Sequence, residues 1–253
     1  MIGTGNLAWH LGPALENSGH SILEVYGRDP KKTRAMQQRL YNATVQKDLD
    51  FSQSDAGLFI LAVSDDAIEE VTNALILPDN AVLVHTSGSQ PIEKLGFAAT
   101  ENTGVFYPVQ TFTKEKKVDF EDIPILIEAY NHHVRDILMD VAKSICKHAY
   151  DIFADDRMAI HLAAVFACNF TNHMFYISDT LLKKHHFDLG ILRPLIAETL
   201  NKSLNLGPED SQTGPARRGD LETLDRHISY LKDENFREVY RILSQQILDH
   251  YHE

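Results

Sequence analysis

Gly3-Thr4-Gly5-Asn6-Leu7-Ala8 is the most informative part of the sequence, because it has the pattern G-x-G-x-x-A at the start of a predicted helix. In a dinucleotide-binding turn, the first glycine makes the tight bend and the second lets the backbone approach a pyrophosphate. The small third residue lets the helix pack close to its strand. An amphipathic run over 7–18 and a strand-like run over 21–26 follow, as a β-α-β unit requires. We therefore expect cofactor contacts from Gly3, Thr4, Gly5, Asn6 and Leu7, whose amide groups favour anionic phosphates.

The first strand of this unit is almost missing from the sequence. Only Met1 and Ile2 precede Gly3, whereas about five further apolar residues would complete a central strand. The pattern suggests a truncated sequence or a misassigned start.

The residues after the second predicted strand bear on which dinucleotide binds. A turn that prefers NAD places an acidic residue there to hold the ribose 2′-hydroxyl. In this chain Gly27 occupies that position, and Arg28 and Lys32 follow it. A guanidinium group is well shaped for a 2′-phosphate, so we predict NADP rather than NAD. Two alternatives stay open: the basic residues form only a solvated loop, or Asp29 takes a ribose hydroxyl.

Composition places the chain among ordinary globular proteins of one or two domains. Its 253 residues are 43% hydrophobic and 24% charged, which is typical of such proteins. The net charge of −12 argues against nucleic acid as the main partner. Cys146 and Cys168 form no C-x-x-C motif and are expected to be buried thiols. No apolar run approaches the length of a membrane span, and no signal pattern opens the chain, so we expect a cytoplasmic protein without a membrane partner.

Strand and helix signals alternate up to about residue 153. Asp65 or Asp66 is expected to cap the helix over 67–75, and Pro124 indicates an edge strand or a strand start. The whole pattern predicts an α/β fold with a doubly wound, mostly parallel sheet. The predicted strands lie at 57–63, 81–85, 104–107, 123–128 and 148–153, and the predicted helices at 31–40, 67–75 and 131–146.

The second half of the chain is predicted to be all-helical. Residues 155–186 contain no Gly or Pro and carry apolar residues at helical spacing, which predicts one helix of about thirty residues. Further helices are expected at 188–205, 221–231 and 235–252, with a loop over 207–219. We place the domain boundary so that 1–153 binds NADP and 154–253 serves substrate binding and dimerisation. The long helix has more apolar surface than a domain of about 100 residues can cover, so a homodimer through these helices is expected.

Several motifs carry a family resemblance that covers essentially the whole chain. The chain resembles a bacterial family of Rossmann-like NADP oxidoreductases with a C-terminal helical domain of unknown function. That family is related to pyrroline-5-carboxylate reductase and to the 6-phosphogluconate and β-hydroxyacid dehydrogenases. The motifs are His85-Thr86-Ser87-Gly88, Tyr107-Pro108-Val109-Gln110-Thr111-Phe112, the run from His161 to Asn169, and Thr213-Gly214-Pro215-Ala216-Arg217-Arg218-Gly219-Asp220.

The loops that follow the buried strands are expected to edge the cofactor and substrate cleft, since ligands bind beyond the carboxyl ends of parallel strands. We place Ala62, Val63 and Ser64 beside the nicotinamide half of the cofactor. The alternative for the loop after the strand over 81–85 is an ordinary turn, with Ser89 capping the helix over 91–95. Tyr107 is expected to pack rather than react. The candidate substrate-binding residues are His85, Thr86, Ser87, Gly88, Ser89 and Gln110.

His161 is the candidate for proton transfer. The resemblance to β-hydroxyacid dehydrogenases places it near the family lysine that protonates the substrate oxygen, and a histidine side chain can donate or accept a proton at neutral pH. The asparagine that the family carries three or four positions later is replaced here by Ala164 and Val165. Asn169 and Asn172 are the substitutes we consider, as catalytic and substrate-binding residues. The alternative is that His161 is an ordinary core or interface histidine.

Arg217 is a candidate clamp for a substrate carboxylate, whereas Asp220 is expected to cap the following helix. The adjacent pairs His132-His133 and His185-His186 point to different helix faces, so we predict no metal.

Together these observations predict an NADP-dependent oxidoreductase that transfers hydride to or from a small carbonyl, imine or hydroxy-acid substrate. The alternative is a non-catalytic NADP(H)-binding sensor or partner-binding protein, kept open by the missing lysine and asparagine. A structural role without cofactor is the third option.

Overall fold

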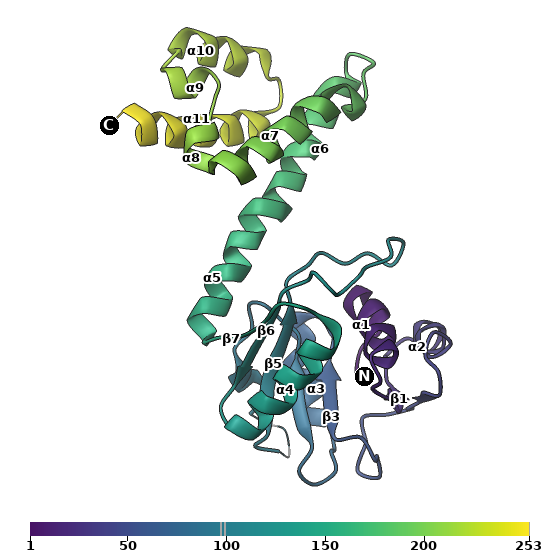
Figure 1. The fold of residues 1–253 in the computed structure, drawn as a ribbon. Coiled ribbons are helices and arrows are strands. Elements are labelled where there is room, and N and C mark those ends of the chain that lie inside the picture. Colours follow the sequence, from purple (N-terminus) through teal and green to yellow (C-terminus); the bar gives the residue numbers. More distant parts are fainter. Residues whose placement is uncertain (97, 99, 253) are drawn as a thin grey trace. The chain divides into compact units, whose positions relative to one another are not determined.

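A five-stranded sheet forms the centre of the first part of the chain in the computed structural model, which describes residues 1–96, 98 and 100–252. Its strands run in the order β3 (Leu58–Leu61), β4 (Val82–His85), β5 (Thr103–Pro108), β6 (Ile125–Ala129) and β7 (Ala149–Asp151) (Figure 1). Neighbouring strands are parallel except β5 and β6, which are antiparallel. The expected mostly parallel sheet is confirmed.

Ile2 occupies the position of the nearly missing first strand. It bridges in parallel to Tyr26 on one side and to Leu61 on the other. The pair β1 (Glu24–Val25) and β2 (Thr44–Val45) is thereby joined to the main sheet. The glycine turn that follows Ile2 is thus held at the middle of the sheet.

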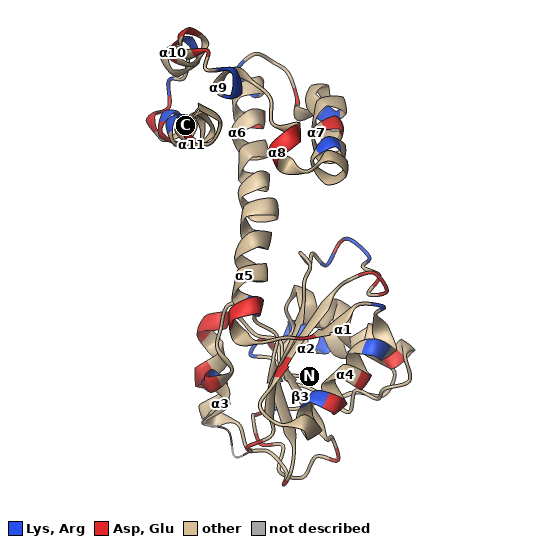
Figure 2. Ribbon diagram, turned by 60° about the vertical axis from the view of Figure 1, so that its left-hand side comes forward, with Lys and Arg blue, Asp and Glu red and all other residues tan. Residues whose placement is uncertain are grey.

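Helices cover both faces of this sheet, because side chains alternate along each strand. Ile60 and Val84 pack in one cluster with α1 (Asn6–Asn17) and α4 (His132–Ile145). Leu61 and Leu83 pack in a second cluster with α3 (Ile68–Ala74). The strands are drawn almost entirely without charged residues in Figure 2, as expected for strands buried on both faces.

Three details of the loops differ from the expectations. Neither Asp65 nor Asp66 caps a helix with its side chain; Ser64 is the N-cap of a short 3₁₀ turn that precedes α3. Ser89 does not cap the next turn, whose N-cap is Pro91. The expected loop over 207–219 contains two four-residue helices, α8 (Pro208–Ser211) and α9 (Pro215–Arg218), each begun by a proline.

The second half is helical, as expected. The long run consists of α5 (Ala154–Ala164), a π-helical segment (Val165–Phe170) and α6 (Thr171–Lys183), and the π segment was not anticipated. The chain divides into two compact units, Met1–Phe166 and the part from Ala167 onward. Among the described residues, no helix combines the length and the apolar character that crossing a bilayer requires. The remaining helices are α2 (Pro30–Gln37), α7 (Arg193–Leu206), α10 (Leu221–Tyr230) and α11 (Glu234–His252).

Candidate active site

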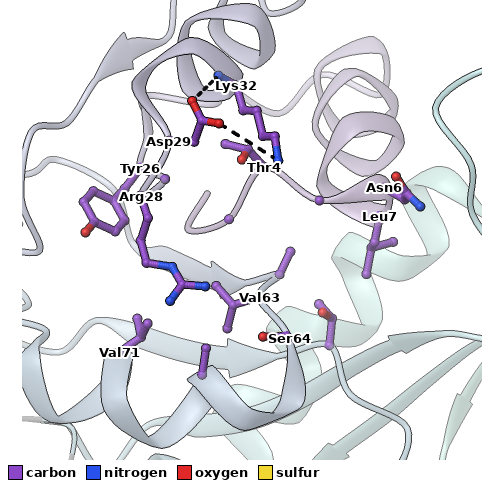
Figure 3. A pocket seen from close by; sticks show the side chains of 16 residues that line it. Thr4, Asn6, Leu7, Tyr26, Arg28, Asp29, Lys32, Val63, Ser64 and Val71 are labelled. Carbon is purple, nitrogen blue, oxygen red and sulfur yellow. Dashed lines mark hydrogen bonds and ion pairs between the residues drawn. The ribbon is translucent and has the colours of Figure 1, made fainter.

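One pocket of the first unit, with a volume of about 510 Å³, brings together all ten residues that the sequence suggested for cofactor binding (Figure 3). Loops at the carboxyl ends of β1 and β3 and the start of α1 form its walls. The ten residues are Gly3, Thr4, Gly5, Asn6, Leu7, Arg28, Lys32, Ala62, Val63 and Ser64. Tyr26, Gly27, Asp29, Ala67, Val71 and Thr86 complete the lining.

The glycine turn is shaped as a cradle. Gly3 has a φ of +120°, and a Cβ at this position would lie 2.1 Å from the Ala62 carbonyl oxygen, so no side chain fits. Gly5 is the N-cap of α1 without a side-chain cap, and the first turn of the helix holds no acidic residue. The amide groups of that turn are therefore available to an anion, and the turn fits a dinucleotide pyrophosphate.

The basic residues of the pocket differ in their surroundings. Asp29 caps α2 by accepting hydrogen bonds from the backbone amides of Lys31 and Lys32, at 2.9 and 3.2 Å. The Lys32 bond is the main cause that lowers the pKa of Asp29. The Lys32 Nζ atom lies 4.0 Å from the Asp29 carboxylate. Arg28 is exposed, forms no ion pair within the described part of the chain, and extends toward Val63 and Val71 (Figure 3). Its guanidinium group is thus free to bind an anionic ligand.

The loop after β4 is held by its own hydrogen bonds. The Nδ1 atom of His85 accepts from the Ser87 amide at 3.1 Å, and the Ser87 hydroxyl oxygen accepts from the amides of Ser89 and Gln90. The Ser89 hydroxyl donates to Asp65 at 2.8 Å, and the Thr86 hydroxyl to the Leu61 carbonyl at 3.2 Å. The expected substrate residues therefore lie together, but their hydroxyl groups already have partners.

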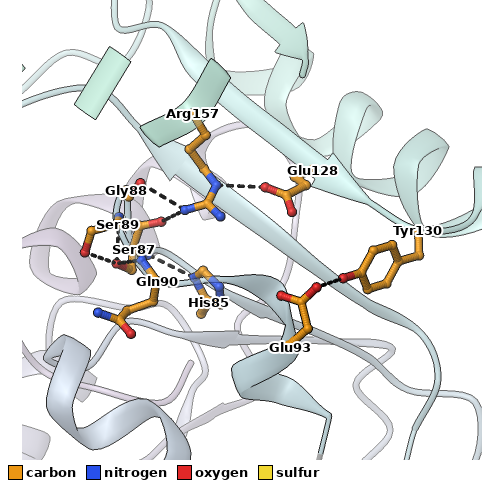
Figure 4. Close-up of polar contacts among 9 residues, drawn as sticks. All are labelled: His85, Ser87, Gly88, Ser89, Gln90, Glu93, Glu128, Tyr130 and Arg157. Atoms are coloured by element: carbon orange, nitrogen blue, oxygen red, sulfur yellow. Dashed lines mark hydrogen bonds and ion pairs between the residues drawn. The ribbon is translucent and has the colours of Figure 1, made fainter. Parts of the chain in front are cut away.

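Arg157 and Glu128 form a buried ion pair beside this loop (Figure 4). The Arg157 side chain is only 2% exposed, and its Nε atom donates to the Glu128 carboxylate at 2.8 Å. Its Nη1 atom donates to the carbonyl oxygens of Ser87 and Gly88 at 3.2 and 2.9 Å. Sequence reasoning missed this cluster, for which the one available signal was a carboxylate at the end of an otherwise apolar strand.

His161 lies one helical turn after Arg157 and contacts the same loop. Its Nδ1 atom is 3.1 Å from the Tyr107 hydroxyl, and the two rings meet edge to face. A Cβ at Gly88 would lie 2.4 Å from that Nδ1 atom, so Gly88 packs directly on the imidazole. Burial is the main cause that raises the pKa of Tyr107, which keeps the phenol protonated. The expectation that Tyr107 only packs overlooked this pairing.

His85 is buried beside this cluster with one ring nitrogen unused. Burial, followed by the charge of Arg157, lowers the pKa of His85 to about 4. Its Nε2 atom has no hydrogen-bond partner among the described residues. His85 is therefore neutral at physiological pH.

Four predicted site residues lie apart from these clusters or in the second unit. Gln110 is exposed, and its side-chain oxygen accepts from the Thr111 amide. Asn169 and Asn172 are exposed residues of the second unit. The guanidinium carbon of Arg217 lies 3.9 Å from the centre of the Tyr251 ring. Their assigned roles stay predictions.

Comparisons with known proteins divide the chain into two matched segments. Residues 1–87 match a family described as NADP oxidoreductase coenzyme F420-dependent, and residues 123–247 match a domain of unknown function, DUF2520. A "putative NADP oxidoreductase" from Bacteroides fragilis is 37% identical, with a TM-score of 0.88 over 98% of this chain and 96% of that one. No curated protein matches the chain significantly.

More distant structures share the fold. A Thermotoga maritima protein is 22% identical, with a TM-score of 0.78 over 98% of both chains. A 1-pyrroline-5-carboxylate reductase from Streptococcus pyogenes is 13% identical, with a TM-score of 0.65 over 99% of this chain and 96% of that one. Within the described residues, no group of three or more His, Cys, Asp or Glu side chains is arranged to hold a metal ion.

Proposed function

Since the chain belongs to the same NADP oxidoreductase family as the Bacteroides fragilis protein, we propose that it transfers hydride between NADP and a small substrate. The substrate would be a carbonyl compound, an imine or a hydroxy acid. The main support for the proposal is that one loop connects the dinucleotide pocket to His161. The pocket that fits a dinucleotide includes Thr86, and Gly88, two residues further on, packs against His161.

The cofactor would be bound by the pocket of Figure 3. The glycine turn and the first amides of α1 would hold the pyrophosphate. Arg28 would bind the 2′-phosphate, because it has no other charged partner in the described chain and its fork matches a phosphate. NADP supplies the hydride chemistry when bound, and the protein supplies orientation and a proton.

His161 would exchange that proton with the substrate oxygen or nitrogen. In this proposal the Nδ1–H group donates to the Tyr107 hydroxyl oxygen, so Nε2 carries the proton that passes to or from the substrate, and the imidazole is neutral once that proton has left. Arg157 would hold the Ser87–Gly88 backbone against the ring, so that the imidazole keeps one orientation. The Thr86–Ser89 loop and Gln110 would face the substrate, and Asn169, Asn172 and Arg217 would be supplied by the helical part.

A homodimer is part of the proposal, because the second unit has little core of its own. Among its described residues, the buried hydrophobic side chains are Ala216, Leu224 and Leu231. Large apolar side chains of α7, such as Leu195 and Leu204, are 63% and 84% exposed. A second copy that covers such surfaces would stabilise the helices.

The test is NADPH oxidation with a panel of imines, keto acids and other carbonyl compounds. We expect at least one substrate to be reduced, and His161→Asn to lower kcat by about 100-fold or more, a typical loss for a general acid. His133→Asn, a change at an exposed histidine of α4, should leave kcat unchanged. Tight NADPH binding without turnover of any substrate would favour a non-catalytic sensor. A fully active His161→Asn protein would remove the proton-transfer role.

A further inference from the structure

The loop that follows β5 is tied to the start of α1 by three hydrogen bonds. The Asn6 side-chain amide donates to the Phe112 carbonyl at 2.8 Å, and the Nε2 atom of His10 lies 2.7 Å from the Thr113 carbonyl. Lys114 Nζ donates to the Thr4 carbonyl at 3.0 Å. Each bond reaches across more than 100 positions of sequence, so the loop is folded onto the glycine turn.

Aromatic packing fixes the same arrangement. The Phe112 ring stacks on His10 and on Phe120, with ring centres 6.1 and 5.8 Å apart. The Lys114 ammonium group lies 4.7 Å from the centre of the Trp9 ring. The motif from Tyr107 to Phe112 thus ends in a segment that places a lysine on the glycine turn.

The charge of Lys114 is not balanced by a carboxylate of the described residues. Lys114 forms no ion pair within the described residues, and the first turn of α1 contains no acidic residue. A helix start carries partial positive charge, so an added ammonium group there is electrostatically unfavourable unless an anion is present. Lys114 is also partly buried, so solvent screens its charge less than that of a fully exposed lysine.

We propose that Lys114 is a cofactor-binding residue that supplies positive charge to the pyrophosphate of the dinucleotide. This inference rests on the proposed function. Arg28 and Lys114 then bind different phosphate groups of the cofactor. Arg28 recognises the 2′-phosphate that distinguishes NADPH from NADH, whereas Lys114 acts on the pyrophosphate that both dinucleotides share.

Calorimetric titration of NADPH and NADH into Lys114→Gln tests this proposal. Calorimetry is preferable to fluorescence here, because Lys114 contacts Trp9. Glutamine keeps an N–H donor for the Thr4 carbonyl and removes the charge. We expect the Kd values of both dinucleotides to rise about tenfold, as for the loss of one charge-assisted contact. Lys114→Arg should restore most of the affinity, and the Kd of Lys114→Gln should depend less steeply on salt.

Two comparisons make the result specific. Lys116→Gln, an exposed lysine of the same loop, should bind as the unmodified protein does, and Arg28→Gln should weaken NADPH alone. Unchanged binding by Lys114→Gln, a loss confined to NADPH, or an equal loss in Lys116→Gln would overturn the inference and leave the proposed function standing. Failure of the unmodified protein to bind either dinucleotide would overturn both.

Discussion

Gly88 is the residue at which the smallest change should disturb the site most. A Cβ at this position would lie 2.4 Å from His161 Nδ1 and 2.6 Å from Tyr107 Cζ. Because the imidazole must move away, we expect Gly88→Ala to lower turnover by about 100-fold, which is the typical cost of a displacement of about 1 Å at a reacting group. NADPH binding should be unchanged. Gly57→Ala is the control, since nothing lies within 4 Å of its added methyl group. Full turnover by Gly88→Ala would show that the His161 geometry is unimportant.

His85 should make stability depend on pH. The pKa of His85 is about 4 in the folded protein, against an ordinary value of 6.5. Between pH 4 and pH 6.5 the His85 side chain is protonated in the unfolded chain but neutral in the folded protein. The free energy of unfolding therefore increases as the pH rises from 4 to 6.5, and the stabilisation is lost when the pH falls back to 4. The shift corresponds to about 3 kcal/mol. Urea unfolding at pH 4, 5 and 6.5 measures this change in the free energy of unfolding. His85→Asn should lose this slope and the exposed His133→Asn should keep it; parallel curves for His85→Asn and the unmodified protein would contradict the account.

The site residues that could be predicted from the sequence are those that lie next to one another in a motif or directly follow a predicted strand. The glycine turn and Arg28 come from one β-α-β unit, so their spacing fixes their neighbourhood. Arg157 meets Ser87 and Gly88 only through the tertiary fold, about 70 positions away. Lys114 reaches Thr4 in the same way. No local pattern encodes such contacts.

At the scale of elements, Arg157 anchors the start of α5 to the sheet. Removing its guanidinium group leaves Glu128, 9% exposed, as a buried carboxylate without a partner. We expect Arg157→Met to lower the free energy of unfolding by about 3 to 5 kcal/mol. Arg135→Met is the control, because its ion pairs with Asp136 and Asp151 involve exposed carboxylates and should contribute at most about 1 kcal/mol. Equal losses in urea unfolding would show that Arg157 is no anchor.

Most elements could be predicted because their periodicity is strong. The continuous apolar runs of β3 and β4 and the cap residue Asn131 before α4 are local signals. The antiparallel pairing of β5 with β6 depends on the path of the connecting loop, which apolar content does not encode. Asp65 looked like a cap for α3, but its carboxylate accepts the Ser89 hydroxyl instead. At this position a hydrogen bond between two loops replaces the helix cap that the local sequence favours.

At the scale of the whole molecule, the weak core of the second unit predicts self-association. Light scattering coupled to size exclusion should give twice the chain mass of 28.6 kDa, because apolar surface of this extent is uncommon on monomers. Urea unfolding should then occur at higher denaturant as protein concentration rises, since a dimer is stabilised by mass action. A monodisperse monomer with a concentration-independent transition would refute the dimer.

Whether the whole chain binds NADPH in preference to NADH decides whether it is an NADP-dependent oxidoreductase. Trp9, the single tryptophan, lies on α1 just after the glycine turn, so its fluorescence should report occupancy while NADPH or NADH is added. We expect NADPH to bind about 10 to 100 times more tightly than NADH, and Arg28→Gln to abolish that difference by weakening NADPH alone. Equal affinity for the two dinucleotides would contradict the role of Arg28. No binding of either would contradict the oxidoreductase account itself.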